Sequence, residues 1–239
     1  MHRSLHDLLE FTGETSVLPY QYDQADLELI ASFFSDDFYP RHWCEPAQKL
    51  FKISIFAFST VIHAWMSELP VHREILSYGR RVLTIGEKAA SDHGYEDTRV
   101  VQAAAYKVLR EYHRMMGFLR FTPDTGGVFT AYCEPDHLVL PALGDYFTAR
   151  FGNTAAWAVI DEKRKLSLSR TPGNHFNITF IGQPLSPNEN AKTGNDEWEK
   201  LWQNYHKTIN NESRNNPDLQ RQCMPKRYWK YLPELSNPT

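Results

Sequence analysis

Hydrophobic spacing is clearest between residues 98 and 115. Apolar residues recur there at spacings of 4, 3, 4 and 3: Val101, Ala105, Val108, Tyr112 and Met115. That rhythm predicts a helix with one apolar stripe. Gly117 follows at a position typical of a helix C-cap, so we expect the helix to end there.

The remainder of the N-terminal half is also mainly helical in pattern. Apolar spacing predicts a helix over residues 24–38 and a helical stretch over 61–91 that is broken near Pro70. The run 50–60 is β-branched and aromatic with charge only at Lys52, which favours a buried strand. A further strand is expected at 17–23.

The middle of the chain reads as a sheet. Strands are expected over 118–121, 128–134, 155–161, 165–170 and 175–182, with one hairpin joining the first two and another joining the third and fourth. A helix is expected to begin near Pro141, because proline suits a first turn. A helix over 197–209 and one or two short helices split at Pro225 close the chain.

These elements predict an α+β fold: a helical N-terminal half, a central antiparallel sheet and C-terminal helices. The domain organisation follows from composition. Residues 1–16 form a lead-in, 17–182 the core, 183–196 a loop rich in Pro, Asn and Gly, and 197–239 a helical segment packed on that core. We expect a single domain.

Charge changes this picture only near the C-terminus. The chain of 239 residues carries a net charge of -3, so it is not a basic nucleic-acid coat as a whole. Between Asn204 and Tyr231, six Lys or Arg residues stand against two acids, a local balance of +4. Such a patch on an acidic body is compatible with docking on nucleic acid, and equally with a solvated helix face.

Cysteine usage and hydropathy exclude several classes. Cys44, Cys133 and Cys223 are far apart and form no CxxC pair, which argues against zinc ribbons, iron–sulfur clusters and a disulfide framework. We expect no metal and no cofactor, and a reducing cytoplasm as the location. The sequence contains no run of 18 apolar residues, so we expect no membrane span. The first residues lack the apolar core of a signal peptide.

Catalytic motifs of the common kinds are absent from the sequence. Weak candidates for acid–base chemistry are Asp161, Asp136 and His113. Turn or cap roles are the plain alternatives for the two aspartates. Glu111 and His113 flank the predicted stripe on opposite sides, so they form no dyad, and an ion pair with Lys107 one turn away explains Glu111.

The segment "NNPDLQRQCMPKRYWKYLPEL" at 215–235 combines cations, aromatics and prolines. It could be a packed clasp, or a surface that grips phosphates and stacks on bases. We expect a mixture, with Trp229 in the core and Arg221 and Arg227 on a working surface. The candidate nucleic-acid-binding residues are Arg114, Arg120, Arg214, Arg221, Lys226, Arg227 and Tyr228.

Four stretches carry a resemblance to a known family: "REYHRMMGFLRF", "EPDHLVLPALGDYFTARF", "WAVIDEKR" and "NPDLQRQCMPKRYWKYLPEL". They are similar, in this order, to a bacterial family of probable DNA metabolism proteins. Met116 stands where that family's pattern would have a lysine. Members resemble a domain fused to uracil-DNA glycosylase-like proteins and tend to be encoded beside a radical SAM protein. The resemblance implies a role in DNA repair or modification, and supplies no catalytic residue.

Three hypotheses therefore stay open. The first is a DNA-binding accessory protein that presents DNA to a radical SAM partner. The second is an enzyme acting on damaged bases or nucleotides through a carboxylate or histidine site. The third is a protein–protein adaptor without affinity for nucleic acid. Salt-dependent DNA binding separates the first from the third.

Overall fold

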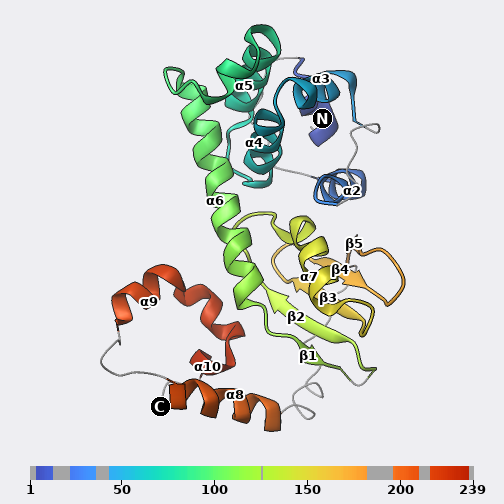
Figure 1. Cartoon of the computed structure of the whole chain (residues 1–239), viewed down its shortest axis with the longest axis vertical. Coiled ribbons are helices and arrows are strands. Elements are labelled where there is room, and N and C mark those ends of the chain that lie inside the picture. Colours follow the sequence, from blue (N-terminus) through green and yellow to red (C-terminus); the bar gives the residue numbers. More distant parts are fainter. Residues whose placement is uncertain are drawn as a thin grey trace. The chain divides into compact units, whose positions relative to one another are not determined.

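The computed structural model describes residues 4–12, 22–35, 43–124, 126–181, 196–209 and 216–236 (Figure 1). The chain forms two compact units. We call Met1–His113 with Asp136–Asp145 the helical unit, and Arg114–Pro135 with Tyr146–Thr239 the sheet unit. The predicted strand at 17–23, apart from its last two residues, and the predicted loop at 183–196, apart from its last residue, lie outside the described residues.

The helical unit is built around one buried helix. Its elements are α1 (Leu5–Leu9), α2 (Gln24–Phe33), α3 (Glu45–Ile53), α4 (Ile55–Met66), α5 (His72–Ile85), η2 (Glu87–Ser91), the larger part of α6 (Glu96–Phe118) and η3 (Leu140–Leu143). Helix α4 is buried on nearly all sides from Ala57 to Met66. The helices predicted at 24–38 and 61–91 are present, and α5 begins after the predicted break near Pro70.

The strand predicted at 50–60 is wrong, because those residues form the end of α3 and the start of α4. Ser54 separates the two helices. Its Oγ accepts the backbone N–H of Ala57 at 3.3 Å and so caps α4. A helix surrounded by other helices has no polar face, and a short apolar run of this kind has the same composition as a buried strand.

Helix α6 runs through the position where the sequence predicts its end. Gly117 lies inside the helix, and the N–H of Leu119 still bonds to the carbonyl of Met115 at 3.3 Å. The predicted strand at 118–121 is also wrong, since β1 begins only at Thr122. Gly117 does not adopt the left-handed conformation that a C-cap glycine provides.

In the part of the sheet unit that the structure describes, five strands lie in the order β1-β2-β3-β4-β5. They are β1 (Thr122–Pro123), β2 (Phe129–Cys133), β3 (Trp157–Asp161), β4 (Leu166–Arg170) and β5 (Asn177–Phe180). The α+β class is confirmed. The sheet is mixed rather than antiparallel, because β2 and β3 pair in parallel with Phe129 opposite Trp157. The chain between them passes through η3 and α7 (Gly144–Phe151), the long crossover that parallel strands need.

Aromatic packing joins α7 to the sheet. Trp157 of β3 is fully buried, and its ring centroid lies 6.0 Å from that of Phe147 and 6.2 Å from that of Phe151. Both phenylalanines belong to α7, which lies over the strands in Figure 1. This cluster fixes α7 on one face of the sheet.

The C-terminal helices belong to the sheet unit. They are α8 (Asp196–Ile209), α9 (Pro217–Cys223), η6 (Lys226–Tyr231) and α10 (Pro233–Ser236). Asn216 caps α9, since its Oδ1 accepts the N–H of Leu219 at 3.0 Å. The predicted break at Pro225 separates α9 from η6. Of the residues in η6, Tyr228 is buried, and so is Leu232 just after it.

We predict that Tyr228→Ala destabilises the protein more than Trp229→Ala, and that Lys230→Ala has the smallest effect. Losing a buried large aromatic costs about 3–5 kcal/mol, whereas an exposed lysine costs about 0.5 kcal/mol or less. Trp229 is half-buried, so its loss falls between these limits. Urea unfolding of the three variants checks the order. Equal midpoints for Tyr228→Ala and Lys230→Ala would contradict the burial of Tyr228.

His63 generates a second prediction. It is buried in α4, its Nδ1 donates to the carbonyl of Ser59 at 2.7 Å, and burial lowers its pKa below 6.5. The unfolded chain then binds a proton at a pH where the folded chain does not. The stability from neutral His63 is fully present above pH 6.5 and is lost as pH falls below it.

The variant His63→Gln should therefore lose less stability than wild type between about pH 7 and pH 5. Asp26 acts in the opposite sense, because burial raises its pKa to about 6 and its contribution is lost as pH rises through that value. Asp26 is present in both proteins, so the difference between the two unfolding curves isolates His63. Parallel pH dependences would show that His63 titrates alike in both states.

Candidate nucleic-acid interface

The basic C-terminal segment is clasped onto the sheet unit by its 3₁₀ helix. Residues three apart share a side in such a helix. Tyr228 packs against Phe118 with ring centroids 5.6 Å apart, and the Tyr231 hydroxyl donates to Glu162 Oε2 at 2.5 Å. Burial and the Glu162 carboxylate raise the pKa of Tyr231, so its hydroxyl stays a donor. This side of η6 faces the protein.

The other two sides of η6 carry its cations. Lys226 and Trp229 share one side, with the Lys226 Nζ 5.9 Å from the Trp229 ring centroid. Arg227 and Lys230 share the other. The Arg227 Nη2 donates to the Tyr228 hydroxyl at 2.8 Å, and its Cζ lies 4.6 Å from that ring's centroid. Lys226 and Arg227 are both exposed.

The expected roles of the two aromatics are exchanged. Tyr228 is only 1% exposed, so its ring cannot stack on a base while η6 stays folded, and this candidate binding residue is a core residue instead. Trp229, expected in the core, is half-buried and donates its Nε1–H to the carbonyl of Met224 at 2.8 Å. The reason is the 3₁₀ geometry, which turns adjacent residues about 120° apart and leaves only one of them facing the sheet.

Arg120 and Lys230 each pair with an acid of the same unit, Arg120 with a carboxylate whose side chain is buried and Lys230 with one that is partly exposed. The Arg120 Nη2 lies 2.6 Å from Glu234 Oε1, and its Nη1 donates to the carbonyl of Gly117 at 2.6 Å. Burial raises the pKa of Glu234, but the hydrogen bond and charge of Arg120, the backbone N–H of Glu234 itself and the hydrogen bond from Trp202 together lower it below its usual value. Lys230 Nζ donates to Glu134 at 2.8 Å. Arg120 therefore joins α10 to the end of α6, and its charge is balanced locally.

Arg114 and Arg221 keep more of their charge available. Arg114 donates its Nη2–H to the carbonyl of Gln222 at 3.2 Å, and a carbonyl does not neutralise a guanidinium. Arg221 pairs with Asp218 one turn earlier on α9, with both side chains largely exposed. Exposed pairs of this kind are weak and screened by salt. Arg214 lies outside the described residues.

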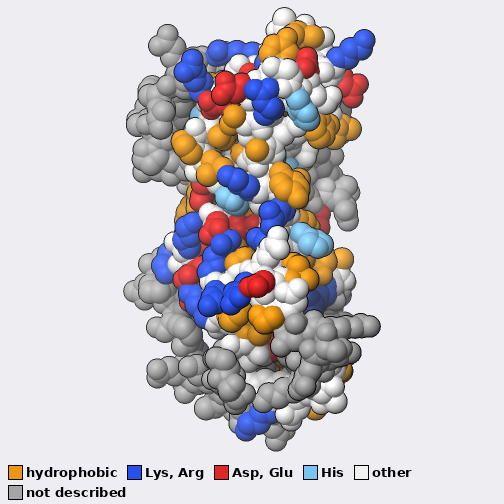
Figure 2. All heavy atoms as spheres, turned by 90° about the vertical axis from the view of Figure 1, so that its left-hand side faces the viewer, with side chains coloured by type: hydrophobic (Ala, Val, Ile, Leu, Met, Phe, Trp, Pro, Cys, Tyr) orange, Lys and Arg blue, Asp and Glu red, His pale blue; other side chains and the backbone are white. Residues whose placement is uncertain are grey.

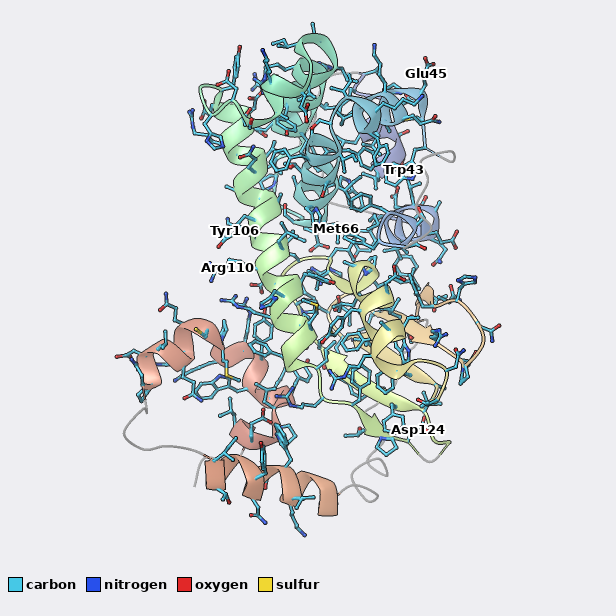
Figure 3. All side chains as sticks on the ribbon, in the orientation of Figure 1. Trp43, Glu45, Met66, Tyr106, Arg110 and Asp124 are labelled. Carbon is cyan, nitrogen blue, oxygen red and sulfur yellow. The ribbon has the colours of Figure 1, made fainter. Side chains whose placement is uncertain are left out.

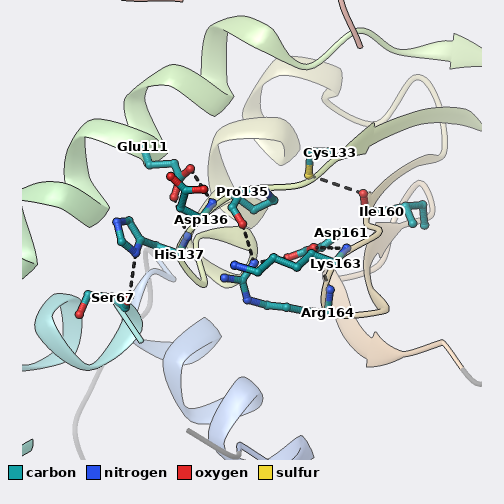
Figure 4. Close-up of polar contacts among 10 residues, drawn as sticks. All are labelled: Ser67, Glu111, Cys133, Pro135, Asp136, His137, Ile160, Asp161, Lys163 and Arg164. Atoms are coloured by element: carbon teal, nitrogen blue, oxygen red, sulfur yellow. Dashed lines mark hydrogen bonds and ion pairs between the residues drawn. The ribbon is translucent and has the colours of Figure 1, made fainter. Parts of the chain in front are cut away.

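Asp161, one of the three acid–base candidates, is fully buried at the end of β3 (Figure 4). Its Oδ1 accepts the backbone N–H groups of Lys163 and Arg164 at 3.0 and 3.1 Å, and its Oδ2 lies 2.9 Å from Arg164 Nη1. That same nitrogen donates to the carbonyl of Pro135 at 3.0 Å. Burial raises the pKa of Asp161, and Arg164 with the two N–H groups opposes the rise. These contacts match the turn role.

Glu111 occupies a place that the sequence does not predict. It is 2% exposed, and its two carboxylate oxygens accept the backbone N–H groups of Asp136 and His137, each at 2.7 Å (Figure 4). The surface ion pair expected with Lys107 is therefore wrong. His137 in turn bonds through Nδ1 to the carbonyl of Ser67 at 2.7 Å. The carboxylate organises the loop that leads into η3.

Asp136 and His113, the other two acid–base candidates, are exposed residues of the helical unit. Asp136 lies in the loop that Glu111 holds, where a turn role was the alternative. His113 lies on α6. Among the residues that the structure describes, no group of three His, Cys, Asp or Glu side chains is placed to hold a metal ion. The same part of the chain contains no helix long and apolar enough to cross a membrane.

Comparison with known proteins gives one result. A family model described as a domain of unknown function, DUF4130, matches residues 70–234. This span begins just before α5 and ends in α10, so it includes α6, the whole sheet and the clasped tail. No curated protein and no solved structure matches the chain. Since the matched residues make up more than half of the sequence, the chain belongs to the DUF4130 family.

Proposed function

We propose that this protein binds DNA through its clasped tail and serves DNA repair or modification as an accessory to a partner enzyme. The observation that carries the proposal is the pair Lys226 and Arg227. Both are exposed, adjacent and held by a helix whose Tyr228 and Leu232 are buried. Cations on a folded helix can bind phosphates without the loss of conformational entropy that ordering a flexible tail would cost.

The surroundings of this pair favour a polyanion. Arg114 and Arg221 add positive charge on α6 and α9, and the half-buried Trp229 offers an aromatic surface beside Lys226. Arginine is well suited to phosphate, because its planar fork can donate two parallel hydrogen bonds. The chain as a whole is acidic, with a net charge of -3, so DNA contact would be confined to such local patches.

Family resemblance supplies the biological context of the proposal. The four quoted stretches are similar to probable DNA metabolism proteins, related to a domain fused to uracil-DNA glycosylase-like proteins. Members of that family tend to be encoded beside a radical SAM protein, and from this we infer such a protein as the partner enzyme. The sparse cysteines favour the cytoplasm as the location. The three cysteines are free in the structure, in keeping with a reducing compartment.

The enzyme alternative has less support from the side chains. Both carboxylate oxygens of Asp161 are bonded within the protein, one to the backbone of the β3–β4 turn and one to Arg164. A general base, by contrast, needs an oxygen that can reach a substrate proton. Asp136 and His113 are exposed residues of the helical unit, one in a loop and one on α6. The accessory role requires none of these residues to react.

A salt series tests the proposal. Wild type should bind DNA weakly, with log K falling against log salt at a slope of roughly −1.5 to −3.5, because about two to four phosphates are neutralised. The double variant Lys226→Ala with Arg227→Ala should flatten this slope by about one to two units. Fluorescence anisotropy with a labelled duplex measures both, and circular dichroism checks folding.

Arg150→Ala with Lys163→Ala is the matched control, since it removes two exposed cations from α7 and the β3–β4 turn of the same unit. It should keep the wild-type slope. If the folded tail variant also keeps that slope, the tail is a structural clasp alone. If wild type fails to bind even at low salt, the protein–protein adaptor takes the place of this proposal.

A further inference from the structure

Helix α6 has an outer face within the helical unit whose composition is unusual. Taking about 100° per residue, the residues within about 60° of Arg110 between positions 99 and 113 form one stripe. They are Arg99, Ala103, Tyr106, Lys107, Arg110 and His113. All six are exposed. We call this stripe the outer face of α6.

The opposite side of the helix fixes the direction in which this face points. Val101 and Val108 are fully buried. Figure 3 shows Tyr106 and Arg110 extending from α6 on the side away from Met66 of α4. The burial of Val101 and Val108 therefore fixes which side of α6 faces outward.

Carboxylates are missing from the outer face between Arg99 and His113, and Glu96, which is exposed on the same side of α6 one turn before Arg99, marks where this face begins. Between Thr98 and Phe118 the only acid is Glu111, which is buried and holds the backbone N–H groups of Asp136 and His137. A solvated helix face commonly mixes acids and bases, which pair one turn apart. Here Lys107 and Arg110 add positive charge with no acid within one turn of them on this face, while Arg99 lies one turn after Glu96.

An exposed aromatic ring lies among these cations. Tyr106 is 61% exposed, and the Arg110 Cζ lies 5.9 Å from its ring centroid. Leu109 is exposed beside the stripe. Figure 2, which faces this side of the molecule, shows Lys and Arg side chains next to hydrophobic ones. An open ring flanked by cations is the combination with which proteins stack an unpaired base and neutralise its phosphates.

We propose that the outer face of α6 binds a single-stranded segment of DNA, with a base on Tyr106 and phosphates on Lys107, Arg110 and Arg99. The inference rests on the proposed DNA-binding function, but assigns a second surface on the other unit. From Arg99 to His113 the helix rises about 21 Å, the length of roughly six stacked nucleotides of one strand. An acidic protein surface would also match the cations, but carboxylates offer no flat face that could stack on the exposed ring of Tyr106.

Two variants, each with a matched control, test this surface. Lys107→Ala with Arg110→Ala removes two cations three residues apart on α6. Lys49→Ala with Lys52→Ala removes two exposed cations at the same spacing on α3 of the same unit. Tyr106→Ala removes the ring, and Tyr106→Phe keeps it. The probes are a labelled oligothymidylate of 12 nucleotides and a labelled duplex of mixed sequence.

On the oligothymidylate, the α6 double variant should flatten the slope of log K against log salt by about 1.4 units, from two phosphates at about 0.7 each. Tyr106→Ala should weaken binding about 5- to 150-fold with the slope unchanged, as expected for one lost base stack. Tyr106→Phe and the α3 control should bind like wild type. Duplex binding should respond little to Tyr106→Ala, because paired bases offer no open face.

The outcomes separate the two proposals. If the α6 variants match the α3 control while the tail variant binds weakly, the outer face is not a DNA site and the tail function stands. If the α6 variants bind weakly and the tail variant does not, the site on α6 stands and the tail function falls. Absence of binding to both probes at low salt overturns both. Tyr106→Ala and Tyr106→Phe share an exposed position, so equal thermal midpoints by circular dichroism confirm that both are folded.

Discussion

Burial of Tyr228 against Phe118 is the contact on which the tail depends. A peptide of this composition would otherwise move freely, because its cations and prolines offer little to bury. With Tyr228 fixed, the threefold repeat of η6 decides every other direction: Tyr231 reaches Glu162, and Lys226 and Arg227 point elsewhere. Tyr228 therefore stabilises the tail and also fixes the directions in which Lys226 and Arg227 point. The helix η6 therefore packs on the sheet unit through one side and carries its cations on the other two.

Much of the fold follows from spacing alone. The stripe from Val101 to Met115 predicts α6, and the turn between residues 161 and 166 predicts the β3–β4 hairpin, because local periodicity determines both. The misassigned run at 50–60 shows the limit of this reasoning. Whether an apolar segment is a buried helix or a buried strand depends on its neighbours, and the N-cap Ser54 is the one local sign of the helix. The parallel pairing of β2 with β3 is likewise not a local property, because it depends on the long crossover through η3 and α7 that joins the two strands.

The candidate site was harder to predict than the fold, for a similar reason. Basic residues near the C-terminus are visible in the sequence, but which of them meet an acid is decided by partners far along the chain, as Arg120 finds Glu234 and Lys230 finds Glu134. Glu111 is the sharpest case. At the border of the apolar stripe it resembles a surface residue, and the backbone N–H groups of Asp136 and His137, which come from a distant part of the sequence, favour its burial.

The mixed sheet also orders the folding of its own unit. Strands β3, β4 and β5 are joined by short turns, so their contacts close small loops and can form early. The pairing of Phe129 with Trp157 closes a much longer loop through η3 and α7. We expect the meander of β3, β4 and β5 to form first and β2 to pair with β3 in a later step. During that interval the edge of β3 is open, and a nascent chain emerging from the ribosome is exposed there to pairing with the wrong strand.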